Sequence, residues 1–410
     1  MTDIADTATP EAGSDDTSRP VIQVSPGRQK RVRAGHPWVF SNEIEMTPEA
    51  KALPRGTLVD VVDAAGSAIG TAIFNPNTLI SARLLTTHSF ADIDADWLAG
   101  KINAAAALRD RLYDRPFYRL VHAEADGLPG LIVDRYGDAC VVQINTAGME
   151  LLSADIVAAL QQTIAPTGIV LQRDSAARHL EGLPDAAPEI IGDVPSPATL
   201  TENGIDFLAD LSEGQKTGWF FDHRENRARV AALSAGQRVA DIYSYLGGFG
   251  LQAAAAGASE VLCIDRSQPA LDLAAQAAAR AGLAEICRFE KSEAFAALEK
   301  LSDDKEKFGV VIIDPPAFIK SKKDLKPGAR GYRKLTRLAA KVVERGGILC
   351  VASCSHHMPM ETYAEQVRRG IHDAGRAARI LHMDGAGPDH PVHPHLPESA
   401  YLKCILMQVD

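Results

Sequence analysis

Short apolar runs alternate with helix-like stretches throughout the second half of the chain. From about Arg238 onward the runs are RVADIYS, EVLCIDRS, CRFEKS, GVVIIDPP, GGILCVASCS and ARILHMD, and helical spacing follows each of the first five. Strands that alternate with helices predict an α/β fold with a doubly wound, mostly parallel sheet. The last run, YLKCILMQV, follows a loop too short for a crossover helix, so we expect it to pair antiparallel.

The first half of the chain has a different pattern. Residues 1–18 contain few apolar positions and predict a disordered tail. Residues 19–88 contain the alternating runs VIQV, TLVDVVDA, IGTAIF and LISARLL, separated by Gly, Pro and Asn, which predict a small β-rich module. Residues 92–190 combine helical stretches with strands such as LIVDRY and predict an α+β middle domain. The proline-rich PDAAPEIIGDVPSPATL predicts a linker, and Asn203-Gly204 predicts a hairpin turn within a last domain at 195–410.

Composition limits the classes of protein that remain. The chain has 410 residues, 46% hydrophobic, with a net charge of −10. No apolar stretch is long enough to span a membrane, and the acidic N-terminal segment is unlike a signal peptide, so we expect a cytoplasmic protein with no membrane partner. The six cysteines show no C-x-x-C pair and predict free thiols. His390, His393 and His395 are interleaved with prolines and lack an accompanying acid or cysteine, so we predict no metal site.

Two local basic stretches stand out against the acidic whole. One is at Arg28–Arg33, and the other is the run from Lys320 to Arg337. Either could be a solvated face or a nucleic-acid contact, because overall charge can hide local patches.

The first strand of the α/β region leads into a glycine-rich turn, DIYSYLGGFG. Ligands bind outside the carboxyl ends of the strands in such sheets, and glycines allow close backbone approach. Asp241 precedes the turn and would oppose a pyrophosphate but attract the ammonium of S-adenosylmethionine, so we favour this cofactor over a nicotinamide dinucleotide. A glycine turn without a ligand is a third interpretation. The predicted cofactor site at this strand end comprises Asp241, Tyr243, Gly247 and Gly248.

The next strand ends extend this site. Asp265 ends the second strand, where its carboxylate could accept both hydroxyls of a ribose, and Arg266 follows it. Ser292 and Glu293 follow the third strand, where the adenine amino group could be held. The fourth strand ends in Asp314-Pro315-Pro316, a rigid turn with Phe318 available to support a flat base. A simple proline-rich strand terminator is the alternative.

Cys354 lies at the carboxyl end of the fifth strand, within SCS. Cys350 shares its strand face but lies about 13 Å away, at 3.3 Å per residue. A lone cysteine is usually a core residue, but this position favours a nucleophile. Attack of a thiolate on C6 of cytosine makes C5 nucleophilic enough to take a methyl group, and Asp314 could assist at N3 and the exocyclic amine. No residue is identified as the base that removes the C5 proton.

These stretches together resemble the bacterial 23S rRNA (cytosine-C5)-methyltransferases, which join an N-terminal PUA domain to a class I methyltransferase domain. The likeness is carried in order by GRQKRVRAGHPWVFSNEI, EADGLPGLIVDRYGD, GQKTGWFFDHREN, YSYLGGFG, DPPAF, GYRKL, SCS and DHPVHPHLPESAYLK. It covers nearly the whole chain after the tail.

The resemblance implies a Rossmann-like, mostly parallel seven-stranded sheet that binds S-adenosylmethionine, and a PUA RNA-binding domain at 19–88. It implies Cys354 as the nucleophile, and Lys216, Phe220 and Arg224 as residues that line or brace the cofactor pocket. The substrate would be 23S rRNA or an assembly intermediate of the large subunit. Its contacts are predicted at Pro315, Pro316, Phe318, Lys320, Arg330, Arg333 and Lys334. The resemblance leaves room for a homodimer, which no sequence feature decides.

Two other functions remain open. An exocyclic-amine methyltransferase would also suit Asp-Pro-Pro-x-aromatic and would need no thiol. A non-catalytic PUA-type RNA-binding or ribosome-assembly protein with a vestigial catalytic domain is the other, and the complete set of Asp241, Asp265, Asp314 and Cys354 argues against it.

Overall fold

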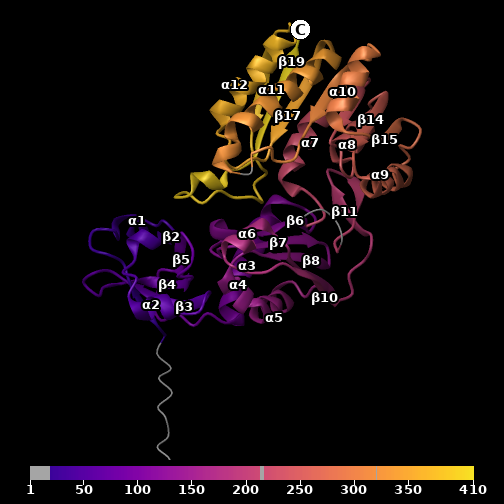
Figure 1. The fold of residues 1–410 in the computed structure, drawn as a ribbon. Coiled ribbons are helices and arrows are strands. Elements are labelled where there is room, and N and C mark those ends of the chain that lie inside the picture. Colours follow the sequence, from indigo (N-terminus) through magenta and orange to yellow (C-terminus); the bar gives the residue numbers. More distant parts are fainter. Residues whose placement is uncertain (1–18, 213–216, 320) are drawn as a thin grey trace, which may run out of the picture. The chain divides into compact units, whose positions relative to one another are not determined.

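The protein forms two compact units, with the boundary after Asp92 (Figure 1). The structure, a computed structural model, describes residues 19–212, 217–319 and 321–410. The predicted tail, residues 1–18, lies outside the described residues. The segments predicted as a middle domain and a last domain both lie in the second unit.

The first unit is built on a β-sheet, in agreement with the alternating pattern of its sequence. Its strand order is β1-β3-β4-β5-β2, with β1 parallel to β3 and the other pairs antiparallel. Alternate residues such as Val59 and Val61 are fully buried in its core. The elements are β1 (Val21–Gln23), α1 (Lys30–Arg33), β2 (Trp38–Phe40), η1 (Ser41–Glu43), α2 (Pro48–Ala52), β3 (Thr57–Val62), β4 (Ala68–Phe74) and β5 (Ile80–Thr86).

The second unit begins with the predicted α+β segment. Its sheet has the order β10-β9-β8-β7-β6. The elements are α3 (Ala95–Leu112), β6 (Phe117–His122), η2 (Ala123–Asp126), β7 (Leu131–Tyr136), β8 (Ala139–Ile144), α4 (Ala147–Leu151), α5 (Ser153–Thr163), β9 (Gly168–Arg173), α6 (Ala176–Leu180) and β10 (Ala186–Gly192). The prediction of a linker was wrong over β10, which pairs antiparallel with β9. Pro188 is tolerated there because β10 is an edge strand.

The predicted hairpin joins this segment to the larger sheet. β11 (Ala198–Glu202) and β12 (Ile205–Ala209) pair antiparallel across Asn203-Gly204, both with positive φ as a type I′ turn requires. They are followed by η3 (Phe221–His223) and α7 (Arg224–Ala231).

The predicted doubly wound sheet is present, with the order β15-β14-β13-β16-β17-β19-β18. β13 to β17 run parallel, and β19 is antiparallel to both neighbours, as predicted. The elements are β13 (Arg238–Ile242), α8 (Gly248–Ala255), β14 (Glu260–Asp265), α9 (Gln268–Arg280), β15 (Cys287–Lys291), α10 (Ala294–Asp303), β16 (Phe308–Ile313), η4 (Lys322–Asp324), α11 (Leu325–Val342), β17 (Val343–Ser353), α12 (Met360–Asp373), β18 (Ala378–Asp384), η5 (Pro397–Ser399) and β19 (Lys403–Val409).

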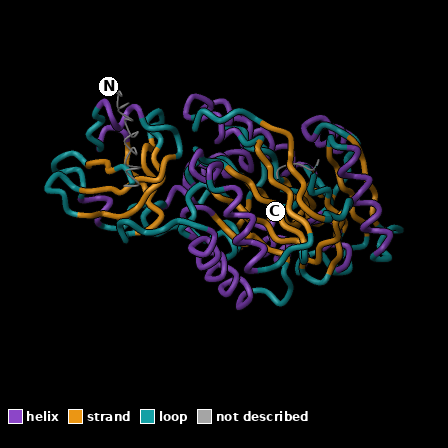
Figure 2. The backbone as a smooth tube through the Cα atoms, turned by 90° about the horizontal axis from the view of Figure 1, so that it is seen from below, coloured by secondary structure: helices purple, strands orange, loops and turns teal. Residues whose placement is uncertain are grey.

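The large sheet separates two hydrophobic cores because neighbouring strand residues point to opposite faces. On β16, Val310 and Ile312 face a core formed with α8 and α9, whereas Val311 and Ile313 face a core formed with α10, α11 and α12. Figure 2 shows the strands of this unit side by side with helices around them. Both faces are therefore covered, and the carboxyl ends of the strands remain to form a site.

All six cysteines are free thiols, in agreement with the sequence analysis. No helix in the described ranges is long and apolar enough to cross a bilayer.

Candidate functional site

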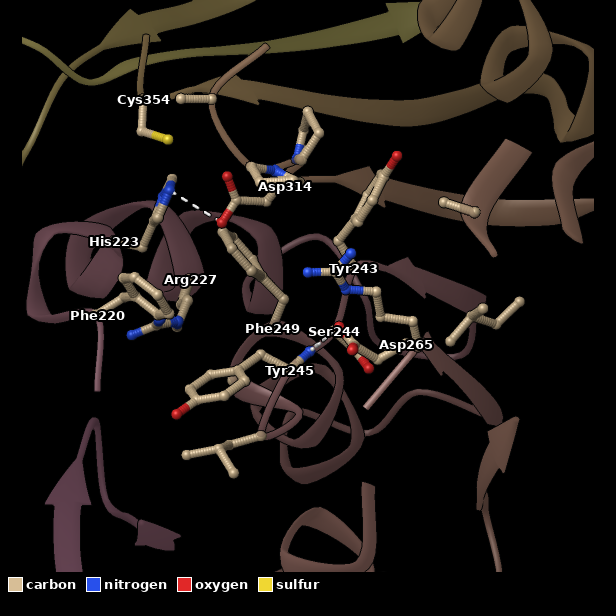
Figure 3. A pocket seen from close by; sticks show the side chains of 18 of the residues that line it. Phe220, His223, Arg227, Tyr243, Ser244, Tyr245, Phe249, Asp265, Asp314 and Cys354 are labelled. Carbon is tan, nitrogen blue, oxygen red and sulfur yellow. Dashed lines mark hydrogen bonds and ion pairs between the residues drawn. The ribbon is translucent and has the colours of Figure 1, made fainter. Parts of the chain in front are cut away.

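A cavity of about 420 Å³ lies at the carboxyl ends of the central strands (Figure 3). Parallel strands bring these ends to one edge of the sheet, which places residues distant in sequence side by side. Twelve of the residues predicted from the sequence line it: Phe220, Tyr243, Gly248, Asp265, Arg266, Ser292, Glu293, Asp314, Pro315, Pro316, Phe318 and Cys354.

An arginine and a tryptophan pack against the glycine turn after β13. A Cβ on Gly248 would lie 2.6 Å from Nε of Arg227 and 3.1 Å from the ring of Trp219, so a larger residue does not fit. Arg227 also donates to the buried Glu202 at 2.8 Å. Tyr243 and Tyr245 have φ values of 67° and 49°, which are rare for non-glycine residues and cluster at functional sites.

Asp241 and Asp265 have different environments. Asp241 does not line the cavity, although we expected it to meet the cofactor there. Its Oδ2 accepts the N–H of Gly250 at 2.8 Å, and burial raises its pKa to about 7 despite this bond. Asp265 does line the cavity, where its two carboxylate oxygens accept the N–H groups of Tyr245 and Ser267 at 3.0 and 2.8 Å. Asp265 is thus held rigidly at the site.

The two serines of SCS explain why Cys354 faces the cavity. Ser353 and Ser355 are fully buried, and their hydroxyls each lie 2.8 Å from the hydroxyl of Tyr332 in α11. Cys354 lies between them and is partly exposed. Figure 3 shows its thiol pointing toward His223 and Asp314.

Lys403 holds the turn that follows Cys354. It lies opposite Ser353 in the pairing of β17 with β19, and its ammonium donates to the carbonyls of Ser355 and Tyr401 at 2.6 Å. Burial lowers the pKa of Lys403 to about 8, against the opposing influence of Cys354. The nucleophile candidate is thus near a buried cation.

Asp314 is paired with a histidine that the sequence analysis did not single out. Nε2 of His223 lies 3.2 Å from Oδ2 of Asp314 (Figure 3). Burial disfavours the imidazolium, but Asp314, together with Asp222 and Cys404, more than offsets burial and raises the pKa of His223 to about 9. Both residues line the cavity with Cys354.

Several predicted residues do not line the cavity. Gly247 makes the turn itself, with φ of 74°. Arg224 points to the middle segment, where it donates to the carbonyl of Phe117 and lies 4.1 Å from the ring of Tyr113. Arg333 and Lys334 on α11 pair with Asp373 and Glu299, and Arg330 is exposed on the same helix. Lys216 and Lys320 lie outside the described residues.

The cavity also contains residues that the sequence analysis missed. They are Trp219, Asp222, His223, Arg227, Tyr245, Phe249 and Phe295, among others. Helical spacing was the available signal for two of them, since His223 directly precedes α7 and Arg227 follows four residues later within it.

The lining suits a charged nucleoside cofactor. It combines the cations Arg227 and Arg266 with the carboxylates Asp265 and Glu293, and adds aromatic rings such as that of Tyr243. S-adenosylmethionine carries an adenosine, which suits the aromatic rings. Its carboxylate suits the cations, and its ammonium suits the carboxylates. The close approach of backbone at Gly248 fits the same ligand.

A doubly wound sheet with such a pocket defines a class I S-adenosylmethionine-dependent methyltransferase. Residues 135–408 match the family model described as "S-adenosylmethionine-dependent methyltransferase", and residues 22–87 match a PUA-like domain. The fold resembles that of a methyltransferase from Streptococcus mutans, with a TM-score of 0.79 and 19% identity over 95% of this chain and 100% of that one. A methyltransferase crystallised with SAH has a TM-score of 0.81 at 19% identity, over 95% and 100% of the two chains.

Curated relatives identify the family within this class. The Erwinia tasmaniensis protein named ribosomal RNA large subunit methyltransferase I is 36% identical over 92% of this chain and 96% of its own length. The Klebsiella pneumoniae protein of the same name is 35% identical over 95% and 98%. The chain therefore belongs to the family of the ribosomal RNA large subunit methyltransferases I, and S-adenosylmethionine is its cofactor.

Proposed function

We propose that this protein forms 5-methylcytidine in the RNA of the large ribosomal subunit, through a covalent bond between Cys354 and C6 of the target cytosine. The observation that carries the proposal is the convergence of Cys354 and Asp314 in one cavity with the cofactor-type groups. The named relatives support the RNA class, and a PUA-like domain is consistent with RNA binding.

The residues suit each part of this reaction. Cys354 as a thiolate forms a bond to C6, which moves electron density to C5, while a proton is gained at N3. In this proposal Asp314 accepts a hydrogen bond from the exocyclic amine and exchanges a proton with N3. S-adenosylmethionine, when bound, supplies the electrophilic methyl group. Loss of the C5 proton and breakage of the C6–S bond then restore the base and the thiolate.

The cofactor contacts are proposed from the positions of the lining residues. Asp265, held by two backbone N–H groups, is assigned to the ribose hydroxyls, and Ser292 and Glu293 to the adenine. Phe318 lies 4.7 Å from Tyr332 between ring centroids and is assigned to the flat target base. Exposed cations on α11, including Arg330, would contact phosphates beside the site.

The test is nucleoside mass spectrometry of unmodified 23S rRNA incubated with S-adenosylmethionine and the protein. We expect 5-methylcytidine with the wild type and none with Cys354→Ala. Cys287→Ala is the matched control, because this cysteine is buried at the start of β15 and does not line the cavity. It should retain activity.

The same experiment separates the alternatives. A methylated adenine or guanine formed by both wild type and Cys354→Ala would contradict the proposal and favour exocyclic-amine chemistry. Absence of any methylated base, with intact cofactor binding, would favour a non-catalytic RNA-binding protein.

A second measurement tests the covalent bond. RNA containing 5-fluorocytidine has no C5 proton to lose, so the methylated adduct should persist and survive denaturing electrophoresis. The complex should form with Cys287→Ala and be absent with Cys354→Ala. A complex with both variants would assign the bond to another residue.

A further inference from the structure

His223 is held in a fixed position in the cavity by contacts with three neighbouring residues. It ends η3, is 2% exposed, and its Nε2 lies 3.2 Å from Oδ2 of Asp314. The amide nitrogen of Asn226 lies 3.3 Å from its Nδ1, and the ring contacts Phe249 edge-on with centroids 5.4 Å apart. The imidazole therefore has one defined orientation toward Asp314.

The proposed reaction needs a proton at this position. Attack on C6 places negative charge on N3 unless N3 is protonated. An ionised carboxylate only accepts hydrogen bonds, so Asp314 in that form cannot supply the proton. The proton must therefore come from another donor, and the imidazole of His223 contacts the Asp314 carboxylate directly.

We propose that His223 is a positioning residue of the reaction that stores this proton and passes it to N3 of the cytosine through Asp314. As the C6–S bond forms, the Nε2–H bond of the imidazolium breaks, Asp314 takes the proton, and the carboxyl then protonates N3. When the C6–S bond breaks, the N3 proton returns by the same route. The proposal rests on the proposed function and adds the source of the proton.

The surroundings of His223 suit a proton that is held but can be released. Carboxylates face it from two elements, Asp314 after β16 and Asp222 in η3, and thiols face it from two more, Cys404 in β19 and Cys354 after β17. Of these, the two aspartates and Cys404 favour the imidazolium and raise the pKa of His223 to about 9, although burial opposes them. The amide nitrogen of Asn226 also opposes the imidazolium. This nitrogen is a donor, and it donates to the carbonyl of Gly385 at 3.1 Å. Both ring nitrogens of an imidazolium are donors too, so Nδ1–H would face another donor.

His223→Gln is the first variant to test. Glutamine keeps an N–H donor toward Asp314 but has no proton to release. We expect kcat for 5-methylcytidine formation to fall on the order of 10²-fold. KM for RNA and the affinity for S-adenosylhomocysteine should stay within twofold, and the fall of kcat above about pH 9 should disappear. A wild-type kcat with a wild-type alkaline limb would overturn the proposal.

Asn226→Asp is the second variant, and it remains informative if His223→Gln does not fold. It replaces the donor at Nδ1 by an acceptor, which favours the imidazolium. We expect the alkaline limb of kcat to move to higher pH. An unmoved limb in a folded variant that binds S-adenosylhomocysteine would overturn the proposal.

Failure of this inference differs from failure of the proposed function. If the wild type forms no 5-methylcytidine and no Cys354-dependent adduct, the proposed function fails. If it forms both and the two variants behave as the wild type does, only the role of His223 fails.

Discussion

The guanidinium of Arg109 donates to the carbonyl of Asp389, 280 residues further along the chain, at 2.9 Å. Arg109 is fully buried and also makes a two-pronged pair with Asp126 at 2.7 and 2.8 Å. This side chain thus joins α3 of the middle segment to the loop before η5, within the second unit.

Arg109→Ala should destabilise the second unit strongly. Removing one partner of a buried pair leaves an uncompensated charge, which costs about 3–5 kcal/mol. Urea unfolding of the variant measures this loss. Arg111→Ala, an exposed position on the same helix, is the control and should change the free energy of unfolding by about 0.5 kcal/mol or less. Equal losses of the free energy of unfolding in the two variants would contradict the stabilising role of buried Arg109.

Gly250→Ala should lower stability and cofactor affinity. An added Cβ would lie 2.6 Å from the Cys263 sulfur and 3.3 Å from the Asp241 carboxylate, so α8 must shift. Thermal unfolding and calorimetric binding of S-adenosylhomocysteine measure the two losses. Gly100→Ala on α3 is the control, since its Cβ meets no atom within 4 Å and should stabilise the helix by about 1 kcal/mol.

Asp265→Asn should weaken cofactor binding. A hydrogen bond to a charged group contributes roughly 1.5–3 kcal/mol, so we expect the Kd for S-adenosylhomocysteine to rise about 10- to 100-fold. Asp272→Asn, exposed on α9, should leave the Kd unchanged. An unchanged Kd for Asp265→Asn would remove this residue from the ribose contact.

The exposed cations on α11 should contribute more to RNA affinity than the cation that is held in an ion pair. Lys326 and Arg330 are exposed, whereas Arg333 lies 2.6 Å from Asp373. Each lost phosphate contact should reduce the slope of log K against log salt by about 0.7 to 0.9. Filter binding across a salt series should show this for Lys326→Ala and Arg330→Ala, and less for Arg333→Ala. Identical slopes for all three would place RNA elsewhere.

The His223–Asp314 pair should make stability depend on pH. The folded pKa of His223, about 9, is above its ordinary value of 6.5, so its stabilisation is complete below pH 6.5 and is lost as pH rises through 9. The difference corresponds to roughly 3 kcal/mol. Wild type and His223→Gln should therefore differ more in free energy of unfolding at pH 6 than at pH 10. A constant difference would indicate a neutral imidazole.

The fold was predictable where the local pattern determines the element. The central strands of the large sheet, such as β16 and β17, contain apolar runs bounded by turn residues, and the Asn203-Gly204 turn has a defined geometry. β10 was missed because Pro188 and its acidic neighbours are typical of a linker, and only pairing with β9 makes the segment a strand.

The site was predictable at the strand ends and less so between segments. Asp265, Asp314 and Cys354 follow from the rule that ligands bind at carboxyl ends. Asp241 lies one residue inside the end of β13, where the N–H of Gly250 covers it. The pairing of His223 with Asp314 depends on how η3 docks on the sheet, which no local pattern specifies.

The strand order of the large sheet also constrains how the protein assembles. β19 lies between β17 and β18, both of which precede it in the chain. Any folding intermediate without β19 exposes the hydrogen-bonding edges of both strands, and unpaired edges favour aggregation. The strand that leads to Cys354 thus has its second neighbour only after β19 docks, so the sheet edge beside Cys354 is completed by the last strand of the fold.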